Sequence, residues 1–198
     1  MKKTILFTTL FLNFALLFAQ GDYDLMYPGM EYEVGTEVRV FGHNTKLRSA
    51  PNTEGEVLTL INIGERVEIL EKAEETYSFY GFDSPWYKIN YGGETGYVVG
   101  GLLAMGIGSY DGLKFVFNYK KEGEKIMLLT RMLGKEHTYT EYQYELDVTE
   151  TRVRVDGNRG IEGVENIVTV SYVAEACGVN GGGFYLFSTK PFLSHEIS

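Results

Sequence analysis

The residues best suited to covalent chemistry are the single cysteine, Cys177, and a histidine near the end of the chain, His195. A catalytic cysteine needs its thiolate stabilised, commonly at a helix N-terminus, and a base within hydrogen-bonding reach. Cys177 instead follows a β-prone run and precedes a glycine cluster, and His195 lies in a stretch without periodicity. The pattern favours a buried structural thiol. We therefore expect no enzyme, and a Cys–His hydrolase is the less favoured alternative.

The sequence also lacks the spacing of a metal or cofactor site. Its three histidines, His43, His137 and His195, are far apart, and none has a partner at i,i+4. Asp156-Gly157-Asn158 lacks the alternating acidic ligands of a calcium loop and is typical of a plain turn. No glycine-rich phosphate loop precedes a helix. The sequence therefore predicts no metal and no cofactor.

Aromatic and cationic side chains in the first half of the chain provide a candidate binding site. Trp86 alternates with Tyr87 and Ile89, so Trp86 is expected to be at least partly exposed if the other two fill a core. Flat rings bury contact area at little entropic cost, and cations orient a carboxylate by charge-assisted hydrogen bonds. The predicted ligand-binding residues are Tyr77, Tyr80, Trp86, Lys88 and Arg48. The alternative is that these aromatic residues cap one end of the domain.

Short strands joined by tight turns must position these residues. Val67 and Ile69 alternate with Arg66 and Glu68, which is the period of a half-buried strand. Tyr87 and Ile89 alternate with Trp86 and Lys88 in the same way. Gly92-Gly93 can adopt the positive φ angles of a tight hairpin, which would join Trp86–Tyr91 to Thr95–Val99. The pattern predicts a small barrel of about five antiparallel strands.

The order of these landmarks resembles the bacterial SH3-like (SH3b) domain family over about residues 36–104. The resemblance implies a small β-barrel that binds a peptide, such as the stem peptide of peptidoglycan, or another exported protein. Two features depart from the family pattern: the long aromatic insert Glu71–Asp83, which we expect to be a flexible loop, and Tyr97, where tryptophan is common. Four segments carry the resemblance: Leu47-Arg48-Ser49-Ala50-Pro51, Gly64-Glu65-Arg66-Val67-Glu68-Ile69, Trp86-Tyr87-Lys88-Ile89 and Thr95-Gly96-Tyr97-Val98.

The rest of the chain predicts a second all-β domain over residues 109–190, with no helix, to which we assign no family. The glycine-rich stretch Met105–Ser109 is expected to join the two domains, and turns are expected at Lys120–Gly123 and Asp156–Asn158. These features predict an antiparallel meander or a partly open barrel. The expected strands are Leu113–Tyr119, Ile126–Leu133, Tyr139–Leu146, Thr151–Val155, Ile167–Ala174 and Phe184–Phe187.

The first residues are typical of a secretory signal peptide over residues 1–19. Lys2 and Lys3 precede the apolar run Ile5–Phe18, which is too short to cross a bilayer of about 30 Å, and Ala19 is a small residue suited to cleavage. We therefore expect export to the periplasm or the medium, with no transmembrane segment. Residues 20–35 are acidic and aromatic without a clear period, and are expected to form a leader loop.

Acidic residues dominate the mature chain and restrict its partners. Removing Lys2 and Lys3 from the 18 basic residues leaves 16 against 27 acidic ones, a net charge of 16 − 27 = −11. Such a charge argues against nucleic acid and acidic wall polymers. The expected partner is a peptide, peptidoglycan or another exported protein, and an assembly protein of the cell envelope is the alternative function. The oligomeric state and the role of the unpatterned residues 191–198 stay open.

Overall fold

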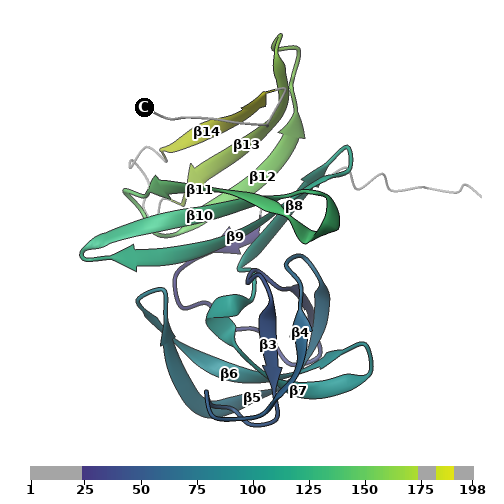
Figure 1. The fold of residues 1–198 in the computed structure, drawn as a ribbon. Coiled ribbons are helices and arrows are strands. Elements are labelled where there is room, and N and C mark those ends of the chain that lie inside the picture. Colours follow the sequence, from purple (N-terminus) through teal and green to yellow (C-terminus); the bar gives the residue numbers. More distant parts are fainter. Residues whose placement is uncertain (1–23, 174–181, 190–198) are drawn as a thin grey trace, which may run out of the picture.

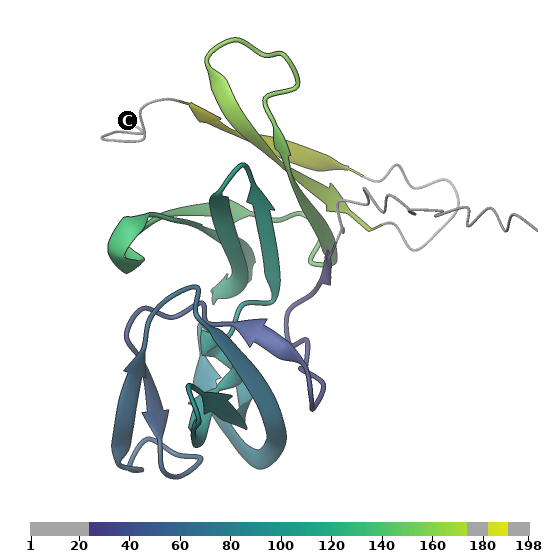
Figure 2. The same ribbon diagram turned by 90° about the vertical axis from the view of Figure 1, so that its right-hand side faces the viewer.

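The computed structural model describes residues 24–173 and 182–189, and it confirms the all-β fold predicted from the sequence. All strand pairs in its sheets are antiparallel. Helix in the described residues is limited to two short 3-10 turns, η1 (Gly100–Leu102) and η2 (Lys135–His137). Figures 1 and 2 show a barrel in the lower half and a second β unit stacked above it.

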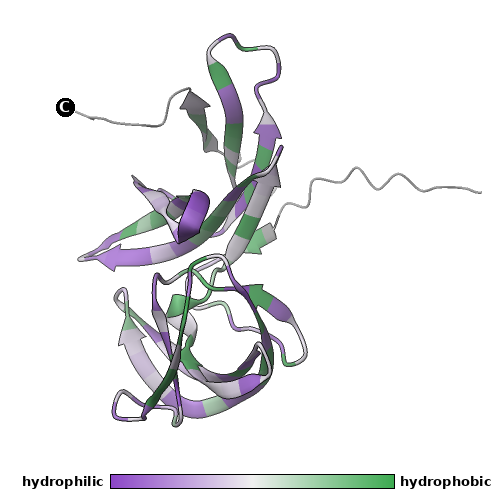
Figure 3. Cartoon of the chain, turned by 45° about the vertical axis from the view of Figure 1, so that its right-hand side comes forward, coloured by the Kyte–Doolittle hydropathy of each residue, from purple (hydrophilic) through white to green (hydrophobic). Residues whose placement is uncertain are grey.

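The barrel is a curved six-stranded sheet with the strand order β2-β5-β6-β7-β3-β4. A β-bridge between Val40 and Leu103 adds a contact outside the named strands. Apolar residues at every second position fill the interior, and hydrophobic and hydrophilic residues alternate along the strands in Figure 3. Its strands are β2 (Glu37–Arg39), β3 (Thr45–Arg48), β4 (Val57–Ile61), β5 (Arg66–Phe79), β6 (Phe82–Tyr91) and β7 (Glu94–Val99).

The predicted hairpin at Gly92-Gly93 is confirmed. Gly92 (φ 61°) and Gly93 (φ 89°) connect β6 to β7, which pair from Trp86–Val99 to Tyr91–Glu94. Positive φ at both central positions gives a turn whose twist matches that of the flanking strands. The core residues Tyr87 and Ile89 are fully buried, as their alternation predicted.

The insert Glu71–Asp83 is not the flexible loop expected from the sequence. It extends β5 and β6 into one long hairpin that closes at Tyr80 (φ 53°) and Gly81 (φ 79°). The backbone N–H of Lys121, in the second unit, donates a hydrogen bond of 2.8 Å to the carbonyl oxygen of Tyr80. The hairpin tip is therefore held by a residue that lies far from it in the sequence.

The second unit consists of two four-stranded sheets, β11-β10-β9-β8 and β1-β12-β13-β14. Buried side chains from both sheets form one core, and the Tyr119 hydroxyl lies 2.7 Å from the Thr151 hydroxyl of the other sheet. This arrangement agrees with the predicted barrel-like second domain. The strands are β8 (Gly106–Tyr110), β9 (Leu113–Glu122), β10 (Lys125–Leu133), β11 (Tyr139–Glu145), β12 (Thr151–Gly157), β13 (Val164–Tyr172) and β14 (Gly183–Thr189).

Three local predictions for this unit were wrong. The expected join Met105–Ser109 forms most of strand β8, whose Gly108 lies so close to Val155 that an added Cβ would be 2.4 Å from a methyl group of Val155. Glycine here permits close approach of the two sheets and does not mark a linker. The turns expected at Lys120–Gly123 and Asp156–Asn158 both begin later, because β9 continues to Glu122 and β12 to Gly157.

The leader expected to be a loop connects both units. Strand β1 (Asp24–Met26) pairs with β12 of the second unit. Tyr32 then enters the barrel core, where its ring contacts Tyr87 edge-on at a centroid distance of 5.4 Å. Its hydroxyl donates a hydrogen bond of 3.1 Å to the carbonyl oxygen of Leu103. The leader is thus part of the fold from Asp24 onward.

A buried apolar cluster, here called the junction, joins the barrel to the second unit. Arg131 of β10 reaches across it, and its Nη1 donates a hydrogen bond of 2.6 Å to the carbonyl oxygen of Phe41. Asn118 of β9 donates to the carbonyl oxygens of Gly101 and Leu103, each at 3.0 Å. The two units therefore share packing and hydrogen bonds. The junction comprises Phe41, Ile63, Ala104, Val116 and Leu129.

Candidate functional site

Two of the predicted binding residues lie in one row on the outer face of the barrel. Arg48 of β3 pairs with Tyr97 of β7, and Tyr97 pairs with Lys88 of β6. Directly opposed residues in antiparallel strands point to the same face, so Tyr97 lies between the two cations. All three side chains are partly exposed. We call this surface the Arg48–Tyr97–Lys88 row.

The loop beside the row is held by its own hydrogen bonds. Arg48 Nη1 donates to the carbonyl oxygen of Gly55 at 2.8 Å. The Asn52 side-chain oxygen accepts from the backbone N–H groups of Glu54 and Gly55, at 3.0 and 2.8 Å. The Glu56 N–H donates to the Ser49 hydroxyl at 3.0 Å. These contacts orient Arg48 before any ligand arrives, which lowers the entropic cost of binding.

The prediction that Trp86 is partly exposed was wrong. Trp86 lies on the outer face with Lys88, but only 4% of its surface is exposed. Tyr77 of the long hairpin packs edge-on against it, with ring centroids 6.3 Å apart, and is itself 43% exposed. The alternation of β6 predicted the correct face for Trp86, but it could not show that the Tyr77 ring covers Trp86 there. Tyr77 is therefore the accessible member of this pair.

Tyr80 lies away from the row, at the junction. Its ring packs against Phe79 at 4.3 Å and Phe41 at 6.4 Å between centroids. Arg131 Nη2 donates to the Tyr80 hydroxyl at 3.3 Å. These contacts agree with the alternative reading, in which aromatic residues of the insert cap one end of the barrel. Its role in ligand binding stays a prediction, and the structure adds a packing role.

A comparison with protein families agrees with this geometry. Residues 43–104 match the bacterial SH3 domain family. This confirms the family named by the four sequence segments, and the matched residues include the whole Arg48–Tyr97–Lys88 row. Searches of curated proteins and of solved structures found no significant match to the chain. The strands outside the SH3 barrel, from β8 onward, thus carry no family assignment.

Sequence reasoning noticed Tyr97 only as a departure from the SH3 family pattern. Nothing local to β7 shows that β3 lies alongside it. The β3–β7 pairing brings Arg48 to Tyr97 from a distant part of the chain. The missing signal was therefore strand order, which is a tertiary property.

The other residues considered for chemistry either lie outside the described residues or have separate contacts. Cys177 and His195, the residues of the hydrolase alternative, lie outside the described residues. His43 packs on the Tyr139 ring at 5.9 Å, whereas His137 Nδ1 lies 3.8 Å from Glu65 Oε1. In residues 24–173 and 182–189, no three His, Cys, Asp or Glu side chains are placed to share a metal ion. Nor does any helix in these ranges have the length and apolarity to cross a bilayer.

Proposed function

We propose that this protein is an exported, non-catalytic binding module whose SH3 barrel holds a peptide, such as the stem peptide of peptidoglycan. The observation that carries the proposal is the Arg48–Tyr97–Lys88 row within the matched residues 43–104. Arg48 and Lys88 supply charge-assisted hydrogen bonds to carboxylates of the ligand. Tyr97 supplies a flat apolar surface between them.

The charge of the whole chain gives the row selectivity. With 18 basic and 27 acidic residues, the protein repels polyanions at long range. Two cations on one small surface can still bind a single carboxylate at short range, because a salt-bridged hydrogen bond depends on local geometry. A short acidic peptide is therefore a better ligand for this row than a wall polymer with many phosphates.

A pull-down of the chain without residues 1–19 on purified peptidoglycan tests the proposal. The double variant Tyr97→Ala, Lys88→Gln is expected to lower affinity about tenfold or more, since one charge-assisted hydrogen bond contributes about 1.5–3 kcal/mol. Arg152→Gln, an exposed charge change in the second unit, is the control and should bind normally. Unchanged retention of the double variant, with a normal unfolding curve, would refute the row as the binding surface.

The alternative function, assembly with another exported protein, is favoured by one surface. Tyr185 and Phe187 project from edge strand β14 with exposures of 59% and 50%, and their rings stack at 6.4 Å. Exposed aromatic residues are enriched at protein interfaces. If the immobilised protein retains a discrete exported protein and no peptidoglycan, the assembly function is supported and the wall-binding function is lost.

A further inference from the structure

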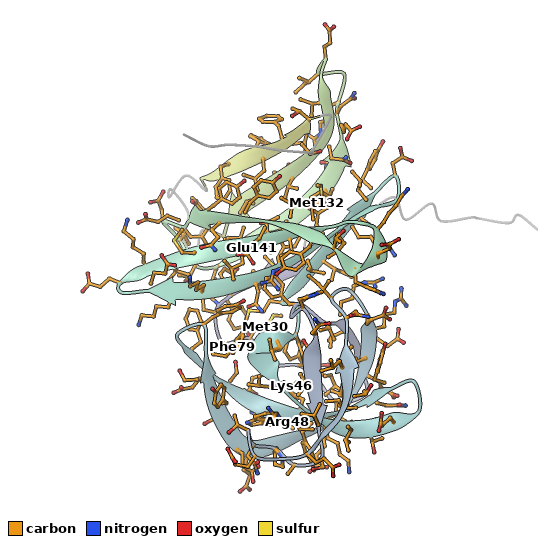
Figure 4. The ribbon with its side chains drawn as sticks, viewed as in Figure 1. Met30, Lys46, Arg48, Phe79, Met132 and Glu141 are labelled. Carbon is orange, nitrogen blue, oxygen red and sulfur yellow. The ribbon has the colours of Figure 1, made fainter. Side chains whose placement is uncertain are left out.

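A second candidate site lies in a cleft where the SH3 barrel, the leader and the start of the second unit meet. The cleft has a volume of about 330 Å³. Met30 and Tyr32 of the leader, Arg39 and Arg66 of the barrel, and Ile107 of β8 are among its lining residues. Figure 4 labels Met30 near the boundary between the two units, and Arg48 further down the barrel. The cleft is thus separate from the Arg48–Tyr97–Lys88 row, and this inference goes beyond the proposed function.

Two arginines and Glu37 are the charged residues that line the cleft. Arg39 of β2 is the direct cross-strand partner of Arg66 of β5. Like charges at directly opposed positions destabilise a strand pair. Burial lowers the pKa of Arg39, and the charge of Arg66 lowers it further, while the carboxylates of Glu65 and Glu37 act in the opposite direction. The two guanidinium groups therefore repel each other, and a bound anion would reduce this repulsion.

The two guanidinium groups differ in their partners. Arg66 Nη1 lies 3.2 Å from Glu37 Oε2, in an ion pair whose side chains are both 64% exposed. Such exposed pairs are weak and readily exchanged. Arg39 donates one hydrogen bond of 2.6 Å, to the carbonyl oxygen of Gly64, and forms no ion pair with any residue in the described ranges. Arg39 therefore keeps donors for an incoming anion.

The remaining lining residues of the cleft are largely apolar. Tyr32 is 9% exposed, and the neighbouring Ala104 and Met105 are buried as well. Ile107 is 47% exposed, so it offers an accessible apolar surface to a ligand in the cleft. A ligand that covered Ile107 while neutralising Arg39 would satisfy both features. The volume of the cleft suits a ligand of one or two amino-acid residues and lies at the small end of the range for ligand sites.

We propose that this cleft binds a carboxylate that carries a small apolar group, with Arg39 and Arg66 on the carboxylate and Met30, Tyr32 and Ile107 on the apolar group. Guanidinium groups match the two oxygens of a carboxylate in a bidentate geometry. The C-terminal residue of a peptide and a free short-chain fatty acid both have this chemistry. A single acceptor without charge, such as a terminal amide, does not.

Titration of the full-length mature protein by NMR, with four small probes, tests the site and its ligand class. The probes are N-acetylleucine, N-acetylleucinamide, N-acetylglycine and hexanoate. N-acetylleucine is expected to bind at least tenfold more tightly than its amide, and more tightly than N-acetylglycine. Comparable binding of the acid and the amide would overturn the carboxylate role. Preference for hexanoate over N-acetylleucine assigns the site to fatty acids, and the reverse assigns it to peptide termini.

Variants locate the binding. Arg39→Gln should weaken N-acetylleucine at least tenfold, and Arg39→Lys should weaken it less, because lysine keeps the charge but not the planar fork. Ile107→Ser, at an exposed position, should reduce the preference for N-acetylleucine over N-acetylglycine without affecting folding. The matched control Lys46→Gln removes an exposed charge of the barrel outside the cleft.

Normal binding by a folded Arg39→Gln variant, or an equal loss of binding in Lys46→Gln, would overturn the proposal. Variants of Lys88 and Tyr97 should bind these probes normally, so failure of the row and failure of the cleft are distinguishable.

Discussion

Arg131 shows how one side chain can hold two units together. It is 6% exposed, and its guanidinium lies 4.1 Å from the centre of the Phe41 ring and 4.5 Å from that of Tyr139. Its Nε donates to Glu141 Oε2 at 2.7 Å. A buried charge is tolerated only when its partners replace water. Hydrogen bonds and two ring faces do so here.

Replacing Arg131 with Met is expected to destabilise the protein by about 3 kcal/mol, because it leaves the Phe41 carbonyl without its side-chain donor and removes the buried ion pair with Glu141. Urea unfolding followed by fluorescence measures the change. Arg131→Lys should give an intermediate loss, since lysine cannot reproduce the planar contact with both rings. Arg152→Met, at an exposed position, should stay within about 0.5 kcal/mol of the parent chain. An Arg131→Met variant as stable as that control would contradict the role assigned to Arg131.

At the scale of elements, the outer part of the long β5–β6 hairpin has two roles. Close to the tip, where Tyr77 pairs with Ser84, it presents Tyr77 to solvent over Trp86, and at the turn it packs Tyr80 against the junction. Gly81 lies at the tip with φ 79°, and an added Cβ there would be 2.9 Å from the Lys121 side chain. The hairpin is therefore a structural connection between the units at its turn, and it carries an accessible ring a few residues before that turn.

Tyr80→Ala is expected to reduce stability by about 2 kcal/mol, since it removes ring packing and a hydrogen-bond partner of Arg131 at a partly buried site. Tyr77→Ala, which truncates the more exposed ring, should cost about 1 kcal/mol or less. Chemical denaturation of both variants measures the difference. Equal losses, or a larger loss for Tyr77→Ala, would show that the tip does not stabilise the junction.

At the scale of the whole molecule, buried tyrosines occur in both units. Burial raises the pKa of five tyrosines: Tyr32, Tyr87, Tyr119, Tyr142 and Tyr144. In the unfolded chain each hydroxyl ionises near its ordinary pKa of about 10. Between that pH and the higher pKa of the folded state, the folded protein holds more protons than the unfolded chain, so stability falls as pH rises.

The free energy of unfolding is therefore expected to be steady from about pH 8 to about pH 9 and to fall steeply above about pH 10. Tyr119→Phe removes one of these groups and should make the alkaline fall shallower, although the loss of its contact with Thr151 lowers stability at neutral pH. Urea unfolding at several pH values gives both quantities. A slope above about pH 10 that is the same in parent and variant would contradict the assignment to Tyr119.

The sequence alone determined the features that depend on neighbouring residues. Alternation placed Tyr87 and Ile89 in the core, and two adjacent glycines located the β6–β7 hairpin. It also gave the all-β class and the SH3 segments, because strand period and turn chemistry are local properties. The net charge likewise needs no coordinates.

Only the tertiary structure decided which residues meet. The hydrogen bond from the Tyr32 N–H to the Tyr87 hydroxyl spans 55 positions, and that from Arg131 to Phe41 spans 90. Such contacts bury Trp86, turn Tyr80 into the junction and place Arg39 opposite Arg66 in a cleft. No local period encodes them, because they depend on the packing of whole sheets against one another. The accessible row and the cleft thus follow from the fold, whereas the barrel that carries them was readable in the chain.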